Sequence, residues 1–241
     1  MIFLLAAALA AAAPAAAPCP SVLTAEAQSC RAVEASAAGK FAEAAAAFEG
    51  AADLTPADDP AHDRALAAAG NMWIAAGQPG KAALALDKAL AGKGLLAEQH
   101  GLALVDRARA AEAQGDLKTA RAKVTEAAST IGEDPYLWYF SAALAIREND
   151  VPTAKSSINR ALAMVPDSPE VMFEAGHVFH AAGEDAKARE YWTRAMTADP
   201  NGPTGKAARE ALAMVDVPLT VTNQVAARPE GDGEGSDKPQ P

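Results

Sequence analysis

The chain has 241 residues and a formal net charge of -10 at pH 7, and 50% of its residues are nominally hydrophobic although only 5% are aromatic. Most of the hydrophobic share is alanine, the strongest helix former, so the composition favours close-packed helices over a globule with one deep core. The acidic balance and the lack of a basic stripe in the sequence exclude a nucleic-acid-binding surface and a polybasic patch for membrane surfaces.

The first segment has the pattern of a secretory signal peptide. Residues 2–13 are a continuous apolar run, Pro14 interrupts it, and three alanines follow at 15–17. The run is shorter than the roughly 20 apolar residues of a membrane-spanning helix, so we expect no stable membrane insertion of the mature chain. We therefore expect residues 1–17 to be a signal peptide, although the sequence does not fix the exact cleavage site. We also expect the protein to be exported, periplasmic or secreted. The alternatives are an uncleaved anchor and a cytoplasmic alanine-rich end.

The two cysteines, Cys19 and Cys30, follow this segment. An even cysteine count in an exported chain predicts a disulfide, which would fix the mature N-terminus to the first helix. The alternative is two unrelated thiols. Pro18 disfavours lipidation of Cys19.

A pattern of small and large residues runs from residue 25 to residue 202. Counted from Pro169, the last unit has Gly176, Phe179, Gly183, Ala188, Trp192, Ala195 and Pro200 at positions 8, 11, 15, 20, 24, 27 and 32. Small residues at positions 8 and 20 let two helices approach closely, and large residues at 11 and 24 fill the space beside them. Gly183 is expected to end the first helix, and Pro200 the second. The pattern recurs in units that begin at residues 135, 101, 63 and 25.

This spacing resembles the tetratricopeptide repeat, a helix–turn–helix unit of 34 residues. The resemblance implies an all-α solenoid of five helix–turn–helix units, which with a C-terminal capping helix would form one domain over residues 18–216. The first two units are four residues longer than the others, and we expect the insertions to lengthen a turn or the end of the second helix. Ala111 and Ala145 at position 11 predict looser or differently filled packing.

The array needs a cover at its C-terminal end, and residues 203–216 supply a candidate. Ala207, Ala211, Leu212 and Val215 form an apolar stripe there, which predicts the capping helix. Residues 217–241 are rich in Pro, Gly and acidic residues and have no helical period, so we expect a disordered acidic tail.

The resemblance also implies that positions 2, 5, 9, 12 and 13 of each first helix line a concave groove. The candidate partner-binding residues at these positions are Arg64, Asn71, Arg109, Glu112, Tyr136, Tyr139, Arg147, Phe173, His177 and His180. Arginines can clamp carboxylates and aromatic rings supply contact area, so this mixture suits an extended peptide. The alternative is a solvated helix face without a ligand.

The sequence holds no known catalytic or cofactor motif, so we expect neither an enzyme nor a cofactor. His177 and His180 share a helix face with the spacing of metal ligands, and Glu174 precedes them, but ordinary groove histidines are the favoured interpretation and no metal is expected. The predicted function is an exported scaffold or adaptor that binds a protein or peptide partner in the groove. The alternative is a structural or assembly protein that acts by self-association; the oligomeric state stays open.

Overall fold

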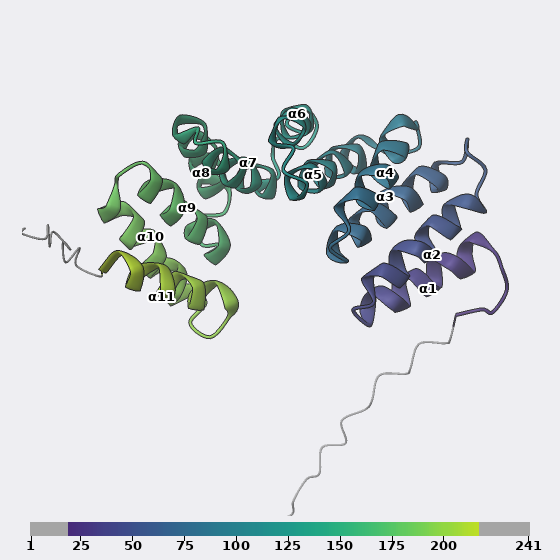
Figure 1. Cartoon of the computed structure of the whole chain (residues 1–241), viewed down its shortest axis with the longest axis horizontal. Helices are drawn as coiled ribbons and strands as arrows, with labels where there is room; N and C mark the ends of the chain where they lie inside the picture. The colour runs from purple at the N-terminus through teal and green to yellow at the C-terminus, as the bar shows by residue number, and fades with distance from the viewer. Residues whose placement is uncertain (1–18, 217–241) are drawn as a thin grey trace, which may run out of the picture.

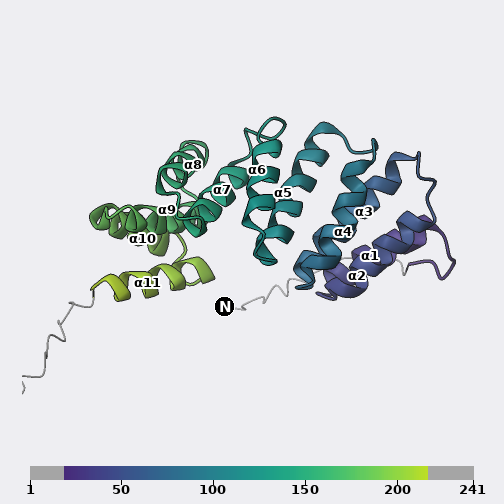
Figure 2. The ribbon, with the colours of Figure 1, turned by 45° about the horizontal axis from the view of Figure 1, so that its top comes forward.

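The computed structural model describes residues 19–216, and in this range the chain is entirely helical (Figures 1 and 2). The elements are α1 (Ala25–Ala37), α2 (Phe41–Asp53), α3 (Pro60–Ala75), α4 (Pro79–Ala91), α5 (Ala97–Ala113), α6 (Leu117–Ala127), α7 (Pro135–Arg147), α8 (Val151–Met164), α9 (Pro169–Ala181), α10 (Asp185–Ala198) and α11 (Pro203–Asp216). Five helix pairs followed by one further helix confirm the predicted fold class. The predicted signal peptide and acidic tail lie outside the described residues.

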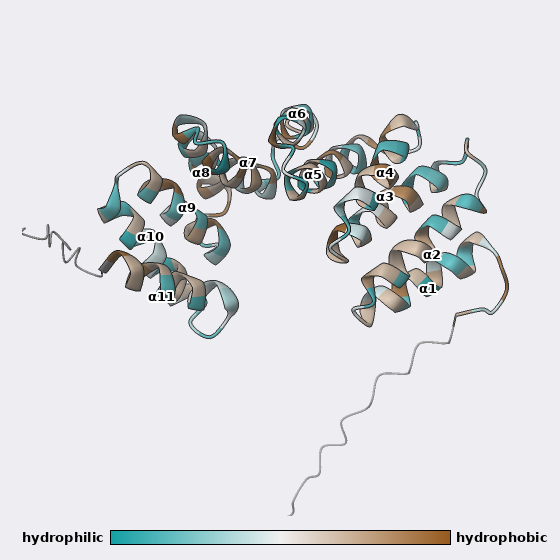
Figure 3. Cartoon of the chain, in the orientation of Figure 1, coloured by the Kyte–Doolittle hydropathy of each residue, from teal (hydrophilic) through white to brown (hydrophobic). Residues whose placement is uncertain are grey.

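The helix pairs follow one another along an arch (Figure 1). At the top of the arch α5 and α7 lie on its inner side and α6 and α8 on its outer side. Hydrophobic and hydrophilic residues are interleaved along the whole array, as Figure 3 shows, because each helix contributes one face to the interior. None of the helices in residues 19–216 combines the length and the apolar character that a membrane crossing requires.

Each pair turns at the same repeat position, 15, and the backbone there is left-handed. Gly39, Gly77, Gly115 and Gly183 have φ between 68° and 80°, and Asn149 has φ 57° in the fourth unit. A side chain is strained in this conformation, and asparagine tolerates it best among non-glycine residues. The turn chemistry therefore explains why glycine recurs at this position and why asparagine is its one replacement.

The core is built from the small and large positions of the pattern. Gly176 lies against Trp192, and a Cβ added at Gly176 would be 2.2 Å from the indole Nε1. Gly70 has the same relation to Leu86, where the added Cβ would be 2.4 Å from Cγ. In the third unit Ala108 fits because its partner position holds the smaller Val124, and both side chains are buried. At Gly70 and Gly176 the side chain at position 24 thus leaves no room for a Cβ at position 8.

The four-residue insertions lengthen the first helices of the second and third units, so the expectation of a longer turn or second helix is wrong. α3 begins at Pro60 and α5 at Ala97, whereas α2 and α4 end where the second helices of the other units end, to within two residues. The early start of α3 has a local cause. Asp59 accepts a hydrogen bond from Ala61 N at 2.8 Å as the N-cap, and proline at the first helical position fits without an N–H.

The two alanines at position 11 are fully buried. Ala111 packs in a cluster with Leu104, Val124 and Phe140, so other large side chains occupy the space that position 11 leaves. At the C-terminal end Ala208 and Ala211 of α11 are buried against the last pair, and Leu212 and Val215 are half-buried there. The helix covers the apolar end of the array.

The segment before α1 is fixed at two points. Cys19 and Cys30 form a disulfide with a Cα–Cα distance of 5.7 Å. Arg31, the next residue, donates through Nη1 to the carbonyl of Pro20 at 2.9 Å and through Nη2 to that of Val22 at 3.2 Å. Residues 19–22 are therefore held along the first helix.

Candidate groove for a peptide

The candidate residues lie on the first helices of four consecutive units. Arg64 and Asn71 belong to α3, Arg109 and Glu112 to α5, Tyr136, Tyr139 and Arg147 to α7, and Phe173, His177 and His180 to α9. The structure brings several of them together in two groups. One is a polar network across α3, α5 and α7, and the other is an aromatic region on α7 and α9.

The polar network joins neighbouring units through carboxylates. Asn71 Nδ2 donates to Asp106 Oδ2 at 2.8 Å, and Arg109 Nη1 donates to Asp106 Oδ1 at 3.0 Å. One unit further, Arg147 Nη1 donates to Glu112 Oε1 at 2.6 Å. Arg109 and Arg147 are therefore each paired with a carboxylate of the groove itself. The sequence pattern did not single out Asp106, because it stands at position 6, beside the positions taken as groove-lining.

Arg64 stands apart from this network. Its side chain is exposed, and it makes no hydrogen bond or ion pair with any other residue of the described range 19–216. It lies on α3, one unit before the aspartate that Asn71 and Arg109 share.

The aromatic region begins at the N-terminal end of α7. The ring centroids of Tyr136 and Tyr139 are 5.8 Å apart, and Tyr136 also stacks on Phe140 with centroids 6.4 Å apart. Burial is the main cause that raises the pKa of both tyrosine hydroxyls, so both stay protonated at neutral pH.

The two tyrosines border a hollow between α7 and α9. Its volume is about 370 Å³, and its walls include Tyr136 and Tyr139 of α7, Val165 and Ser168 of the connecting loop, and Glu170 and Val171 of α9. Tyr136 is 43% exposed, so one wall of the hollow is an aromatic ring open to solvent.

The histidines of α9 pack against aromatic rings. His177 meets Phe173 edge-on with centroids 4.6 Å apart and Trp192 edge-on at 5.4 Å, and burial lowers its pKa. His180 Nδ1 is 2.8 Å from Asp185 Oδ1. In the described range there is no group of three or more His, Cys, Asp or Glu side chains that could hold a metal ion. The arrangement is that of neutral or hydrogen-bonded groove histidines.

Glu174 is the groove residue whose role the sequence pattern did not reveal. Its carboxyl group is half-buried on α9, and it has no hydrogen bond or ion pair within residues 19–216. Burial raises its pKa to about 7. It stands at position 6 of its unit, the same position as Asp106, so the signal that was missed is an acidic residue at position 6.

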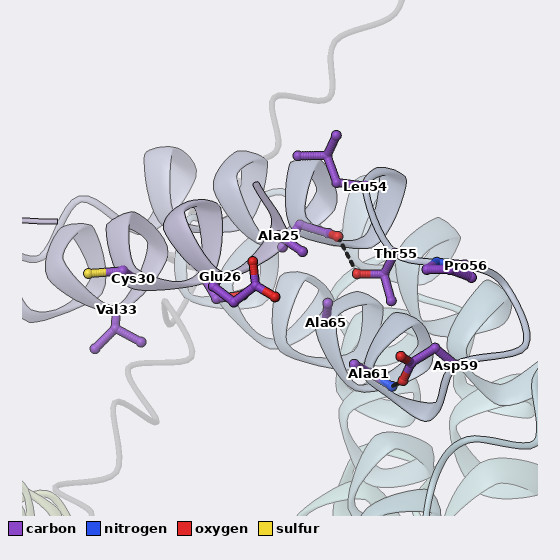
Figure 4. A pocket seen from close by; sticks show the side chains of 12 residues that line it. Ala25, Glu26, Cys30, Val33, Leu54, Thr55, Pro56, Asp59, Ala61 and Ala65 are labelled. Atoms are coloured by element: carbon purple, nitrogen blue, oxygen red, sulfur yellow. Dashed lines mark hydrogen bonds between the residues drawn. The ribbon is translucent and has the colours of Figure 1, made fainter. Parts of the chain in front are cut away.

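A second hollow lies at the N-terminal end of the array. Its volume is about 680 Å³, and Figure 4 shows the side chains of α1, of the connection between α2 and α3, and of α3 that surround it. Val33 and Leu54 at its border are 61% and 42% exposed. Val33 and Asn71 both occupy position 9 of their units. The positions that predicted the groove on α3 therefore also predict that it begins at this hollow on α1.

Comparison with known families matches residues 141–203 to the tetratricopeptide repeat. Among solved structures, PilW, described as a widely conserved type IV pilus biogenesis factor, is 16% identical with a TM-score of 0.65, over 76% of this chain and 81% of PilW. YrrB, described as a TPR protein with an unusual peptide-binding site, is 17% identical with a TM-score of 0.57, over 77% and 92% of the two chains. The pilF protein of Pseudomonas aeruginosa is 12% identical with a TM-score of 0.63, over 78% of this chain and 82% of that chain. No curated protein sequence matches the chain. At these identities the likeness to the solved structures shows the fold.

Proposed function

Because this chain belongs to the tetratricopeptide-repeat family, whose fold is that of protein–protein interaction scaffolds, we propose that it is an exported scaffold that binds an extended peptide segment of a partner protein. The peptide lies along the inner faces of α3, α5, α7 and α9. The observation that carries this proposal is the hollow between α7 and α9 with its wall of two tyrosines.

A ligand explains the aromatic wall better than solvent does. A solvated helix face needs only polar side chains, whereas Tyr136 keeps 43% of its surface exposed beside a mainly apolar hollow. The volume of about 370 Å³ is within the range of small ligand pockets and is ample for one long side chain. YrrB carries a peptide-binding site on a similar fold, so the architecture accommodates this use.

The arginines of the groove act as positioning groups in this proposal. Arg109 holds Asp106, and Arg147 holds Glu112, and each ion pair is partly exposed. Such pairs contribute about 0–1 kcal/mol each, but the contact of Arg147 with Glu112 also spans two units and so orients α7 relative to α5. A ligand meets these groups already paired.

Export is supported by two features of the N-terminal region. Disulfides persist in oxidising compartments, and Cys19 and Cys30 are bonded. The apolar run at residues 2–13 has the length of a signal-peptide core. The predicted signal peptide at residues 1–17 would be removed just before the first of the two cysteines.

Crosslinking and co-purification from intact cells, followed by fractionation, test the proposal. The groove variant carries Tyr136→Ala and Tyr139→Ala, and the matched control carries Tyr191→Ala on α10, the second helix of its unit. We expect a partner in the envelope or secreted fraction that the groove variant loses and the control keeps. Equal recovery with both variants moves the interface out of the groove. Recovery of the chain in the cytoplasm with its N-terminal segment intact refutes export.

A further inference from the structure

The C-terminal half of the groove has carboxylates without cations. Glu170 accepts a hydrogen bond from Ser168 Oγ at 2.8 Å but forms no ion pair in the described range, and Glu174 has no partner there at all. The two residues are four apart on α9 and therefore lie on one face of the helix, one turn from each other. The nearby groove arginines are occupied, because Arg109 binds Asp106 and Arg147 binds Glu112. Neither of these two carboxyl groups therefore has a cationic partner among the described residues.

The aromatic hollow adjoins these carboxylates. Glu170 is one of its walls, and Tyr139 forms another. The charges of Glu174 and Glu170 act on the Tyr139 hydroxyl and, after burial, are among the causes that raise its pKa. Glu170 and the two tyrosines thus line the hollow, and Glu174 lies one helical turn beyond Glu170, near enough to Tyr139 for its charge to act on the hydroxyl.

We propose that this hollow is the subsite for a lysine or arginine side chain of the bound peptide, whose methylene stem packs on Tyr136 and Tyr139 and whose charge is met by Glu170 and Glu174. The inference rests on the proposed function and names the chemistry that the groove selects.

Each part of the subsite favours a cation over other side chains. Lysine and arginine bury an apolar stem while the charged group reaches a polar partner, and their cations are attracted to aromatic faces. A purely apolar side chain would cover Glu174 further and leave its carboxyl unpaired, which is unfavourable. An acidic side chain would be repelled by both glutamates and by a chain with a net charge of -10.

The half-buried carboxyl of Glu174 is in the state expected of an unfilled site. Without a cation, burial raises its pKa to about 7, so near neutral pH a large share of the group carries a proton. A lysine or arginine brought beside it favours the ionised form and releases that proton. Binding of a basic side chain then replaces the missing partner.

A peptide array on the whole mature chain tests the inference. The probe is a positional-scanning set of nine-residue peptides in which one position is fixed and the others are degenerate. We expect wild-type protein to bind pools with fixed lysine or arginine about tenfold more tightly than pools with fixed leucine or glutamate. Glu174→Gln and Glu170→Gln should each reduce this preference, and the double variant should remove it. Glu190→Gln on α10 changes the net charge equally outside the groove and should keep the preference.

The outcomes separate this inference from the proposed function. Wild-type binding without a preference for basic residues, or with a preference for acidic ones, overturns the basic subsite while the peptide groove stands. A basic preference that survives in the double variant also overturns the subsite. No binding of any pool by folded wild-type protein refutes the peptide-binding function together with the subsite. Circular dichroism on each variant shows that the helices are retained, so a lost preference reports the side chains.

Discussion

The replacement Gly176→Ala tests whether Trp192 at position 24 excludes a Cβ at position 8 of the same unit. The added Cβ would be 2.2 Å from Trp192 Nε1 and 2.3 Å from its Cδ1, so the indole must move by about 1 Å or more to reach ordinary contact. Overpacking of this kind costs about 1–3 kcal/mol. The shift also weakens the hydrogen bond from Trp192 Nε1 to the Phe173 carbonyl, 3.2 Å long, which adds about 1 kcal/mol. We expect the free energy of unfolding to fall by about 2–4 kcal/mol.

Urea denaturation followed by far-ultraviolet circular dichroism measures this loss, and a second background isolates its cause. In a Trp192→Val background, Gly176→Ala creates the pair that Ala108 and Val124 form in the third unit. In that background Gly176→Ala should be neutral or stabilising by up to about 1 kcal/mol, because alanine is the better helix former. The reasoning is refuted if Gly176→Ala costs the same in both backgrounds, or less than about 0.5 kcal/mol in the wild type.

Three further measurements address the turn, the disulfide and the buried acid. Gly183→Ala should cost about 1 kcal/mol, and Gly183→Asn less, because the turn needs a left-handed backbone that Asn149 already tolerates; equal costs in urea denaturation would contradict this. Replacing both cysteines by serine should destabilise the first unit by up to about 3 kcal/mol, seen as faster hydrogen exchange in α1 with α9 unchanged. Burial raises the Glu174 pKa from 4.5 to about 7, so the native state holds a proton that the unfolded state releases across this window, and stability falls as pH rises through it. Glu174→Gln should therefore stabilise the protein at pH 8 but not at pH 4; His177, whose pKa is lowered, titrates in both proteins and cancels in the difference.

The helical array was predictable because each signal is local or recurs at a fixed interval. The glycine at position 15 reports a turn whatever lies around it, and Gly39, Gly77, Gly115 and Gly183 all adopt the conformation that only a turn requires. The pairing of Gly176 with Trp192 joins residues 16 apart within one unit, so the spacing alone indicates the contact. The pattern in one unit is a weak signal, but its recurrence in five units is enough to predict the fold.

The position of the insertions could not be predicted from the repeat pattern alone. A surplus of four residues per unit fixes the length of a segment and leaves open which helix receives it. Asp59 and the proline that follows it form a helix-start signal that is visible in the sequence, and α3 begins there and is longer as a result. The local capping chemistry outweighed the expectation drawn from repeat length.

The groove was only partly predictable because its chemistry depends on which side chains pair with one another, within a helix and between units. Register placed Arg109 and Arg147 on the inner helices, but their charges are cancelled by Asp106 and Glu112, and Arg147 lies a full unit from its partner. Glu174 has a raised pKa because its carboxyl group is largely buried, and no spacing rule predicts that burial. The sequence predicted a mixed groove for an extended peptide, and the pairing of Arg109 and Arg147 is what led us to propose a basic side chain as the ligand of its C-terminal half. The proposed basic subsite rests on the carboxyl groups that remain unpaired in the groove, and a single neutral replacement, Glu174→Gln, tests it.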